Sequence, residues 1–351
     1  MCKKAIIAMS GGVDSSVAAA LCIEQGLQCV GITLKLFSGE NCCCSLPDVN
    51  DARNVAFNLG FSHYVLNFTE EFDRYVIRNF IETYEQGATP NPCIECNRHI
   101  KFNLLLLRTK QLDFDMLATG HYARVMRDPA SGRYLLRKAL DEKKDQSYVL
   151  YCLTQNQLER AFFPLGSLSK NEVRKIAGDK KLVNAKKGES QDICFVPDGD
   201  YGGFIEKYTG KTYPYGNIID TEGGIIGKHK GIIRYTIGQR RGLGVAANTP
   251  VYVTAKSAAD NTVTLGHDSF LFSKYLTAGN INLIACPDLK KPMRVTVKTR
   301  YMQTAASAVA EQTGEDSLRI EFDEPQRAIT PGQAAVMYDG DIVIGGGTIV
   351  Q

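Results

Sequence analysis

Residues 10–16 read Ser-Gly-Gly-Val-Asp-Ser-Ser, and they lie between a short apolar stretch at 5–9 and a helical pattern at 13–25. Two adjacent glycines let backbone N–H groups approach phosphate oxygens closely. The N-terminus of the following helix adds partial positive charge, and the serines add hydroxyl donors. Asp14 would repel phosphates, so its expected task is to hold a magnesium ion. The segment therefore predicts a phosphate-binding loop.

This loop differs from a Walker loop, because it contains no lysine followed by serine or threonine. A glycine turn that only caps a helix is the alternative, but a strand before the turn and a helix after it favour nucleotide binding. Residues 242–247 imitate a dinucleotide fingerprint and residues 223–229 imitate a Walker loop. Both lack the required continuation, so we expect turns there.

The thiols are the second group that could carry chemistry. The chain has eleven cysteines, an odd number, and Cys42, Cys43 and Cys44 are consecutive, which disfavours a secreted disulfide framework. We interpret that triple as a surface loop with incidental thiols. Cys93 and Cys96 lie one helical turn apart behind Thr-Pro-Asn-Pro at 89–92, and Cys194 comes much later. A thiol near a helix N-terminus has a lowered pKa, which favours nucleophilic or metal-binding use.

Alternating elements must position these groups. Strands are predicted at residues 5–9, 29–36, 63–68 and 116–119, and helices at 13–25, 45–59, 70–86 and 101–112. This alternation is typical of an α/β fold, a parallel sheet with helices on both faces. From about residue 201 glycine and β-branched residues rise. Short strands with turns are expected at 216–252, and strands at 294–301, 317–322, 334–338 and 341–349 predict a small β-barrel. The predicted domains are 1–200, 201–275 and 276–351.

Composition sets looser bounds. Hydrophobic residues make up 44% and charged residues 23% of the chain, as in ordinary globular proteins. No apolar run is long enough to span a membrane and the N-terminus does not fit a signal peptide, so we expect a cytoplasmic protein. The net charge of +3 is too small to identify a polyanionic partner. In a strand at 294–301, however, Arg294, Thr296, Lys298 and Arg300 would share one face. Such a basic row suits phosphate contacts, although a solvated face is the alternative. Arg240 and Arg241 form a second candidate patch.

Seven segments carry a resemblance to a known family. They are the loop at Ser10, residues 89–97, Ala-Thr-Gly-His-Tyr at 118–122, Lys-Asp-Gln-Ser-Tyr at 144–148, residues 190–195, Tyr-Thr-Ile-Gly-Gln-Arg-Arg-Gly-Leu at 235–243 and Thr-Pro-Gly-Gln at 330–333. The loop resembles that of the ATP-pyrophosphatase superfamily. In this order the segments resemble the bacterial tRNA-specific 2-thiouridylase family over nearly the whole chain. The resemblance implies an ATP-pyrophosphatase (PP-loop) domain of the adenine-nucleotide alpha-hydrolase type, a small central domain and a C-terminal β-barrel.

The resemblance also implies an activity and its residues. ATP with Mg²⁺ would adenylate the C2 oxygen of a tRNA wobble uridine, and sulfur would replace it, delivered by a persulfide-relay protein or a cysteine desulfurase. Cys96 matches the nucleophile and Cys194 the persulfide carrier. The matching ATP contacts are Ala8, Met9, Ser10, Gly11, Gly12, Val13, Asp14, Ser15, Leu34 and Gly120. The matching tRNA contacts are Asn91, Pro92, Cys93, His121, Lys144, Asp145, Gln146, Arg300, Tyr301 and Gln333.

Several alternatives stay open. Many family members carry aspartate where this chain has Cys93, so Cys93, Cys96 and Cys194 could instead hold a [4Fe-4S] cluster with one open iron. A PP-loop enzyme that adds ammonia or an amine would share the loop but have no need of the thiols. A nucleotide-binding redox sensor without catalysis is a third reading, which the intact Ser10 and Asp14 disfavour. Of the histidines, only His121 lies in a motif, and His63, His99, His229 and His267 are read as structural or surface residues.

Overall fold

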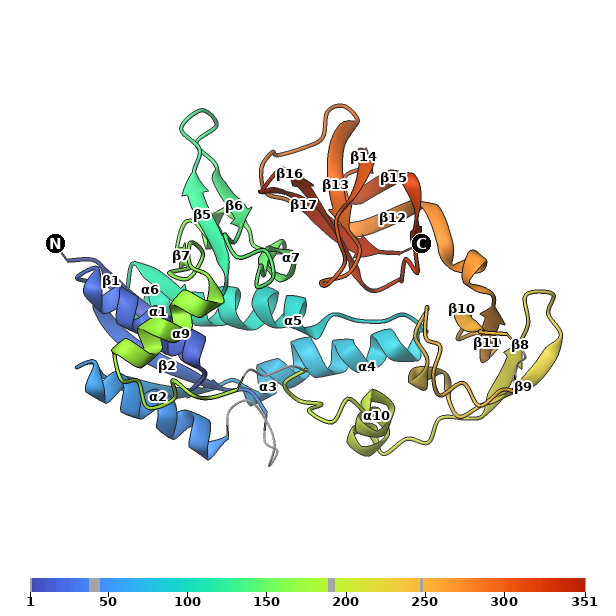
Figure 1. Cartoon of the computed structure of the whole chain (residues 1–351), viewed down its shortest axis with the longest axis horizontal. Helices are drawn as coiled ribbons and strands as arrows, with labels where there is room; N and C mark the ends of the chain where they lie inside the picture. Colours follow the sequence, from blue (N-terminus) through green and yellow to red (C-terminus); the bar gives the residue numbers. More distant parts are fainter. Residues whose placement is uncertain (1, 38–44, 189–192, 247–248, 351) are drawn as a thin grey trace.

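The computed structural model describes residues 2–37, 45–188, 193–246 and 249–350, which form three sheets (Figure 1). The first is parallel, with the strand order β3-β2-β1-β4-β7. Its strands are β1 (Lys4–Ala8), β2 (Gln28–Lys35), β3 (His63–Asn67), β4 (Met116–Thr119) and β7 (Ala161–Phe162). The predicted parallel sheet is therefore present. The cysteines at 42–44 lie outside the described residues.

Helices cover both faces of this sheet, because successive residues of β1 point to opposite sides. Ile7 packs into a cluster with α1 (Val13–Glu24), α2 (Leu46–Asn58) and α9 (Lys170–Asp179). Ile6 packs into the other cluster, with helical segments that carry Phe72, Phe80 and Phe102. Ser45 caps α2 by accepting a hydrogen bond from the Asp48 backbone N–H, as the Ser-Leu-Pro sequence predicts.

Two long helical runs cover the second face. The first comprises α3 (Thr69–Phe72), the π-helical η1 (Asp73–Ile77) and α4 (Arg78–Glu85). The second comprises α5 (Pro92–Glu95), the π-helical η2 (Cys96–Leu105) and α6 (Leu106–Gln111). The predicted start of the second run at residue 101 was wrong, since the helix begins nine residues earlier. Asn91 is its N-cap and Pro92 its first residue, so the double-proline segment starts a helix.

The chain changes character after α9. α10 (Tyr201–Thr209) is followed by a small sheet with the order β10-β11-β8-β9. Its strands are β8 (Gly216–Ile219), β9 (Ile225–His229), β10 (Tyr252–Ser257) and β11 (Thr262–Gly266), with 3-10 turns η3 (Ile232–Arg234) and η4 (Asp268–Leu271). The segment that imitated a Walker loop is thus a hairpin turn followed by β9, rather than a turn alone.

The last sheet closes into a barrel, because β12 pairs with both β15 and β17. Its strands are β12 (Phe272–Leu283), β13 (Met293–Lys298), β14 (Ala306–Gly314), β15 (Ser317–Arg327), β16 (Ala334–Asp339) and β17 (Ile342–Ile349). The hairpin of β5 (Ala123–Arg127) and β6 (Tyr134–Lys138) extends it through Arg137, opposite Ile342. Figure 1 shows the barrel beside this hairpin and above α5. Two short helices, α7 (Ser147–Leu150) and α8 (Gln155–Leu158), complete the fold.

The basic row expected at 294–301 is formed only in part, because Arg294, Thr296 and Lys298 alternate with the buried Val295 and Val297 but Arg300 lies outside the strand. The strand ends at Lys298, and Arg294 is paired with Asp323. The Arg300 guanidinium lies beyond the strand and donates to Ile237 O and Ala328 O, both at 3.0 Å, and to Thr330 Oγ1 at 2.7 Å. Arg300 therefore joins the segment before β10 to the barrel. None of the helices in the described part of the chain has the length and apolar character that crossing a membrane requires.

Replacing Arg300 by methionine should lower the free energy of unfolding by about 2 kcal/mol, since three acceptors lose a charged donor. Urea denaturation measures this change. Arg294→Met is the matched control, because it breaks only an exposed pair with Asp323 and should leave the midpoint where it is. Equal midpoints for Arg300→Met and the wild type would contradict the structural role.

Candidate active site

The loop at residues 10–12 connects β1 to α1 in a conformation that its glycines permit. Gly11 has φ +75°, and a Cβ there would lie 2.2 Å from the carbonyl oxygen of Asp48. Gly12 is the N-cap of α1 and has no side chain to cap the helix. The first N–H groups of a helix have no intrahelical acceptor, so here they are available to an anion.

The serines serve the loop differently from the prediction. Ser15 Oγ and Ser16 Oγ each donate to the Gly12 carbonyl at 3.0 Å, and Ser15 Oγ accepts from the Ser10 N–H at 3.2 Å. Ser16 is fully buried. These hydroxyls therefore hold the loop in shape, while Ser10 and Ser15 still line both cavities.

Asp14 makes the strongest contacts of the loop. Its carboxylate accepts from Lys170 Nζ at 2.6 and 2.8 Å and from the Tyr122 hydroxyl at 2.9 Å. A magnesium ion in nucleotide sites takes one or two carboxylates and completes its shell with phosphates and water. A single half-exposed carboxylate beside the loop fits that requirement. Lys170 is on α9, and its contact with Asp14 was not predicted because no motif around Lys170 indicates that it reaches the loop.

Asn184 and Lys187 also hold the loop, through hydrogen bonds to the Gly11 carbonyl. Asn184 Nδ2 donates to Gly11 O at 2.8 Å and to Ser16 Oγ at 2.9 Å. Lys187 Nζ donates to Gly11 O at 3.2 Å and is paired with Asp48 and Asp51 on α2. The Lys187 pair lowers the pKa of Asp48 against the opposing effect of burial. Sequence reasoning missed these residues as well, since they lie more than 130 positions from their partners.

Two cavities meet at the loop. The first, of about 340 Å³, has an apolar wall of Ile32, Leu34, Phe72 and Val76. The second, of about 840 Å³, is rich in lysines and includes Lys143, Lys144, Lys170 and Lys187. Both are lined by Ser10, Asp14, Ser15, Cys93, Lys101, His121, Gln146 and Ile193. We call the first cavity the apolar chamber and the second the basic chamber. The two chambers adjoin at the loop.

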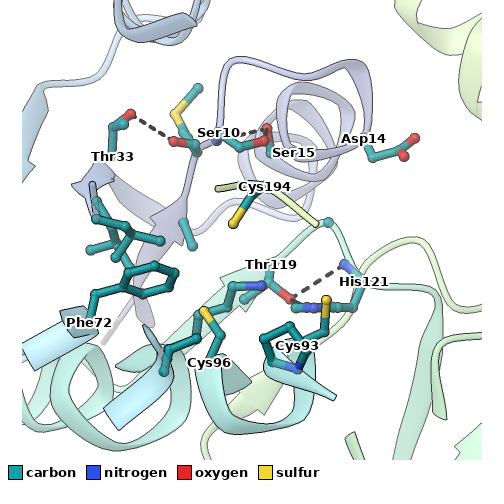
Figure 2. Close-up of a pocket in the computed structure, with 18 of the residues that line it drawn as sticks. Ser10, Asp14, Ser15, Thr33, Phe72, Cys93, Cys96, Thr119, His121 and Cys194 are labelled. Atoms are coloured by element: carbon teal, nitrogen blue, oxygen red, sulfur yellow. Dashed lines mark hydrogen bonds between the residues drawn. The ribbon is translucent and has the colours of Figure 1, made fainter. Parts of the chain in front are cut away.

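The three predicted thiols line the first cavity together with the loop (Figure 2). Cys93 is exposed at the first turn of the helix that Asn91 caps, Cys96 is buried one turn later, and Cys194 is half-buried. The described residues nevertheless contain no group of three His, Cys, Asp or Glu side chains placed to hold a metal ion. The three thiols therefore share one cavity, although they do not converge on a point where they could bind a single metal ion.

His121 lines the same cavity and lies beside Thr119 and Cys93 (Figure 2). Its Nδ1 is 2.7 Å from Thr119 Oγ1, and its side chain is almost fully buried. Burial, together with the positive charge of Lys101, holds the pKa of His121 well below its ordinary value. The imidazole is therefore neutral at physiological pH. Gly120 beside it allows a close approach, because a Cβ there would lie 2.7 Å from the Ser15 N.

The remaining predicted residues divide into two sets. Asn91, Pro92, Lys144, Gln146 and Tyr301 line the cavities, as do Ala8, Met9, Gly12, Val13, Leu34 and Gly120. Tyr301 lines the second cavity together with Cys93, and burial raises the pKa of its hydroxyl to about 12, with charges at Asp145 and Cys93 adding to the shift.

Four predicted residues, Gly11, Asp145, Arg300 and Gln333, do not line either cavity. These residues instead hold the backbone segments around the cavities. Asp145 accepts from the Ala139 and Ser147 N–H groups at 3.0 and 3.1 Å. Gln333 Nε2 donates to the carbonyls of Thr89 and Pro90, each at 3.0 Å, so the barrel holds the segment that leads into α5.

Comparison with known proteins covers nearly the whole chain. Residues 3–198 match the tRNA methyl transferase HUP domain, residues 202–267 the tRNA methyl transferase PRC-barrel domain, and residues 273–349 the aminomethyltransferase beta-barrel domain. The tRNA-specific 2-thiouridylase MnmA of Clostridioides difficile is 48% identical, over 99% of this chain and 98% of its own. The proteins of the same name from Acetivibrio thermocellus and Symbiobacterium thermophilum are also 48% identical, over 99% of this chain and 99% and 92% of theirs.

Proposed function

The chain belongs to the bacterial tRNA-specific 2-thiouridylase family, and on that premise we propose that it replaces the C2 oxygen of a tRNA wobble uridine with sulfur at the expense of ATP. The observation that carries this proposal is one cavity lined both by the phosphate loop and by Cys96 and Cys194. Such a cavity can bring the α-phosphate of ATP to O2 of the base and a sulfur nucleophile to the adjacent C2.

The nucleotide fits the two chambers by its chemistry. The apolar wall of Ile32, Leu34 and Phe72 suits an adenine ring, and the loop at Ser10 suits the phosphates. Asp14 would hold the magnesium ion, which when bound would polarise the phosphates. The uracil O2 attacks the α-phosphorus, the bond to the bridging oxygen breaks, and pyrophosphate leaves with the electron pair. The uracil N3 proton passes to solvent water, which leaves a neutral adenylated base.

Sulfur transfer then needs only two thiols. A donor protein, a persulfide relay or a cysteine desulfurase, leaves a terminal sulfur on Cys194. That sulfur attacks C2 and AMP departs, forming a disulfide between the base sulfur and Cys194. The Cys96 thiolate attacks Cys194 Sγ, which releases 2-thiouridine and leaves a Cys96–Cys194 disulfide for a thiol reductant. An iron–sulfur route would in addition require Cys93 as a third ligand, whereas the persulfide route uses only Cys96 and Cys194.

The tRNA is proposed to enter through the basic chamber. Lys143 and Lys144 line it, as do Tyr301 and Met302 from the barrel, and Met302 is 84% exposed at its rim. Arg300 and Gln333 would act on tRNA through the segments that they hold rather than by direct contact. We also propose domain boundaries near residues 200 and 275 and a cytoplasmic location, where tRNA and ATP are both present.

The proposed activity is tested by mass analysis of tRNA nucleosides from a strain that lacks the gene. 2-Thiouridine derivatives should disappear and should return when the wild-type gene is supplied. Purified protein given tRNA, ATP and a persulfide donor should form one AMP per thiolated base. An unchanged nucleoside profile would contradict the proposal, and an amine-modified base would favour the ligase alternative.

A further inference from the structure

Lys170 occupies a position that helix stability does not explain. It is the first residue of α9, directly after the N-cap Ser169. A cation at a helix N-terminus opposes the helix dipole, which favours acidic side chains there. The lysine is also only 9% exposed, and buried lysines are rare unless they are paired. Its placement therefore calls for a reason outside α9.

The partner of this lysine is the phosphate loop. Lys170 Nζ lies 2.6 and 2.8 Å from the two carboxylate oxygens of Asp14. It lines the basic chamber together with Ser10, Gly12 and Ser15. A lysine that contacts phosphates in this position would supply the positive charge that the loop's own sequence lacks.

Asp14 does not depend on Lys170 for its placement. It lies in the first turn of α1, where the helix dipole favours a carboxylate, and it also accepts from the Tyr122 hydroxyl at 2.9 Å. The Asp14 carboxylate can therefore exchange its contact with Lys170 for a contact with a magnesium ion. If it turns to a magnesium ion, the ammonium of Lys170 keeps its place beside the loop and needs new acceptors.

We propose that Lys170 is a catalytic residue that binds the β- and γ-phosphates of ATP and stabilises the negative charge that develops on the departing pyrophosphate. The proposal rests on the proposed use of ATP by this site. Before ATP binds, the ion pair with Asp14 holds the ammonium of Lys170 beside the loop. During adenylation the electron pair of the broken α-phosphate bond stays on pyrophosphate, whose oxygens accept hydrogen bonds from Lys170 Nζ. A charge-assisted contact of this kind is strongest where water is excluded.

The same two helices provide a matched control. Lys180 at the C-cap of α9 forms an ion pair with Glu24 at the end of α1, as Lys170 does with Asp14 at their beginnings. Lys180→Met therefore removes a similar interhelical pair at a distance from the cavities. If Lys170 only linked α9 to α1, Lys170→Met and Lys180→Met would have the same effect on ligand binding.

Binding of ATP, pyrophosphate and AMP is measured by calorimetry without tRNA. Lys170→Met should weaken ATP and pyrophosphate binding by roughly 10- to 100-fold, the loss expected for hydrogen bonds to charged groups. AMP binding should be unchanged, because AMP lacks both phosphates that Lys170 contacts. Lys170→Arg should retain most of the ATP affinity, and Lys180→Met should match the wild type for all three ligands.

Wild-type ATP affinity in Lys170→Met, or an equal loss for AMP, would overturn the proposal and leave a packing role. Should Lys170→Met fail to fold, the ¹³C-methylated lysine signal of Lys170 in wild-type protein gives the answer. That signal should shift with pyrophosphate and not with AMP, and a signal indifferent to pyrophosphate would overturn the proposal. A protein that shows this binding pattern but thiolates no tRNA would refute the proposed function and leave the role of Lys170 intact.

Discussion

Replacement of Cys194 by serine should abolish 2-thiouridine formation, by roughly a thousandfold or more, the scale on which loss of a covalent nucleophile acts. A serine hydroxyl has nearly the same size but cannot carry a transferable sulfur. The phosphate loop is untouched, so tRNA-dependent AMP formation should continue without sulfur transfer. Nucleoside mass analysis and AMP chromatography on the same reaction measure the two steps separately.

The controls for this variant are other thiols of the chain. Cys286 is half-buried like Cys194 but lies after β12 in the barrel, so Cys286→Ser should thiolate normally. Cys93→Ser should also retain thiolation, since the persulfide route uses only Cys96 and Cys194. Wild-type thiolation by Cys194→Ser would contradict the proposed route. Loss of both thiolation and bound iron in Cys93→Ser would instead support the cluster.

Replacement of Gly11 by alanine should reduce AMP formation by about two orders of magnitude, the effect that a displacement of about 1 Å can have on catalysis. An L residue at φ +75° costs roughly 1–2 kcal/mol. The added Cβ would also overlap the Asp48 carbonyl at 2.2 Å, which forces the loop away from α2. The nucleotide phosphates would then meet a displaced set of N–H groups. Calorimetry with ATP and an AMP assay measure the loss.

A Gly26→Ala variant separates the effect of backbone strain from the effect of the close contact between residue 11 and Asp48. It has the same φ of +75°, but a Cβ there meets nothing within 4 Å. Gly26→Ala should therefore lose some stability and keep its ATP turnover. If Gly11→Ala were no worse than Gly26→Ala in ATP turnover, close packing of the loop against α2 would not be essential.

The sequence predicted those parts of the site whose determinants are local. The strand, turn and helix around Ser10 are predicted correctly because they are contiguous in the sequence. The start of the helix at Pro92 was missed, although Asn91 as N-cap and Pro92 at the first position form a recognised signal. Pro90 and Pro92 stand among residues that also favour turns, and this composition concealed the start of the helix.

Long-range contacts could not be predicted in the same way. Lys170 lies 156 positions from Asp14, and nothing in the sequence around it indicates that partner. The hairpin of β5 and β6 joins the barrel through a strand 205 positions later, from Arg137 to Ile342. Arg300 was expected in a basic row, but the strand ends before it and nearby carbonyl oxygens take up its guanidinium. Each of these depends on which surfaces meet after folding.

The most direct test of the account follows the oxygen that leaves the base. A tRNA that carries ¹⁸O at C2 of the wobble uridine is thiolated by the purified protein with ATP and a persulfide donor. Adenylation of that oxygen predicts that the ¹⁸O appears in the phosphate of AMP, in the same amount as the 2-thiouridine formed. Recovery of the ¹⁸O in water or pyrophosphate, with unlabelled AMP, would contradict activation of the C2 oxygen by ATP.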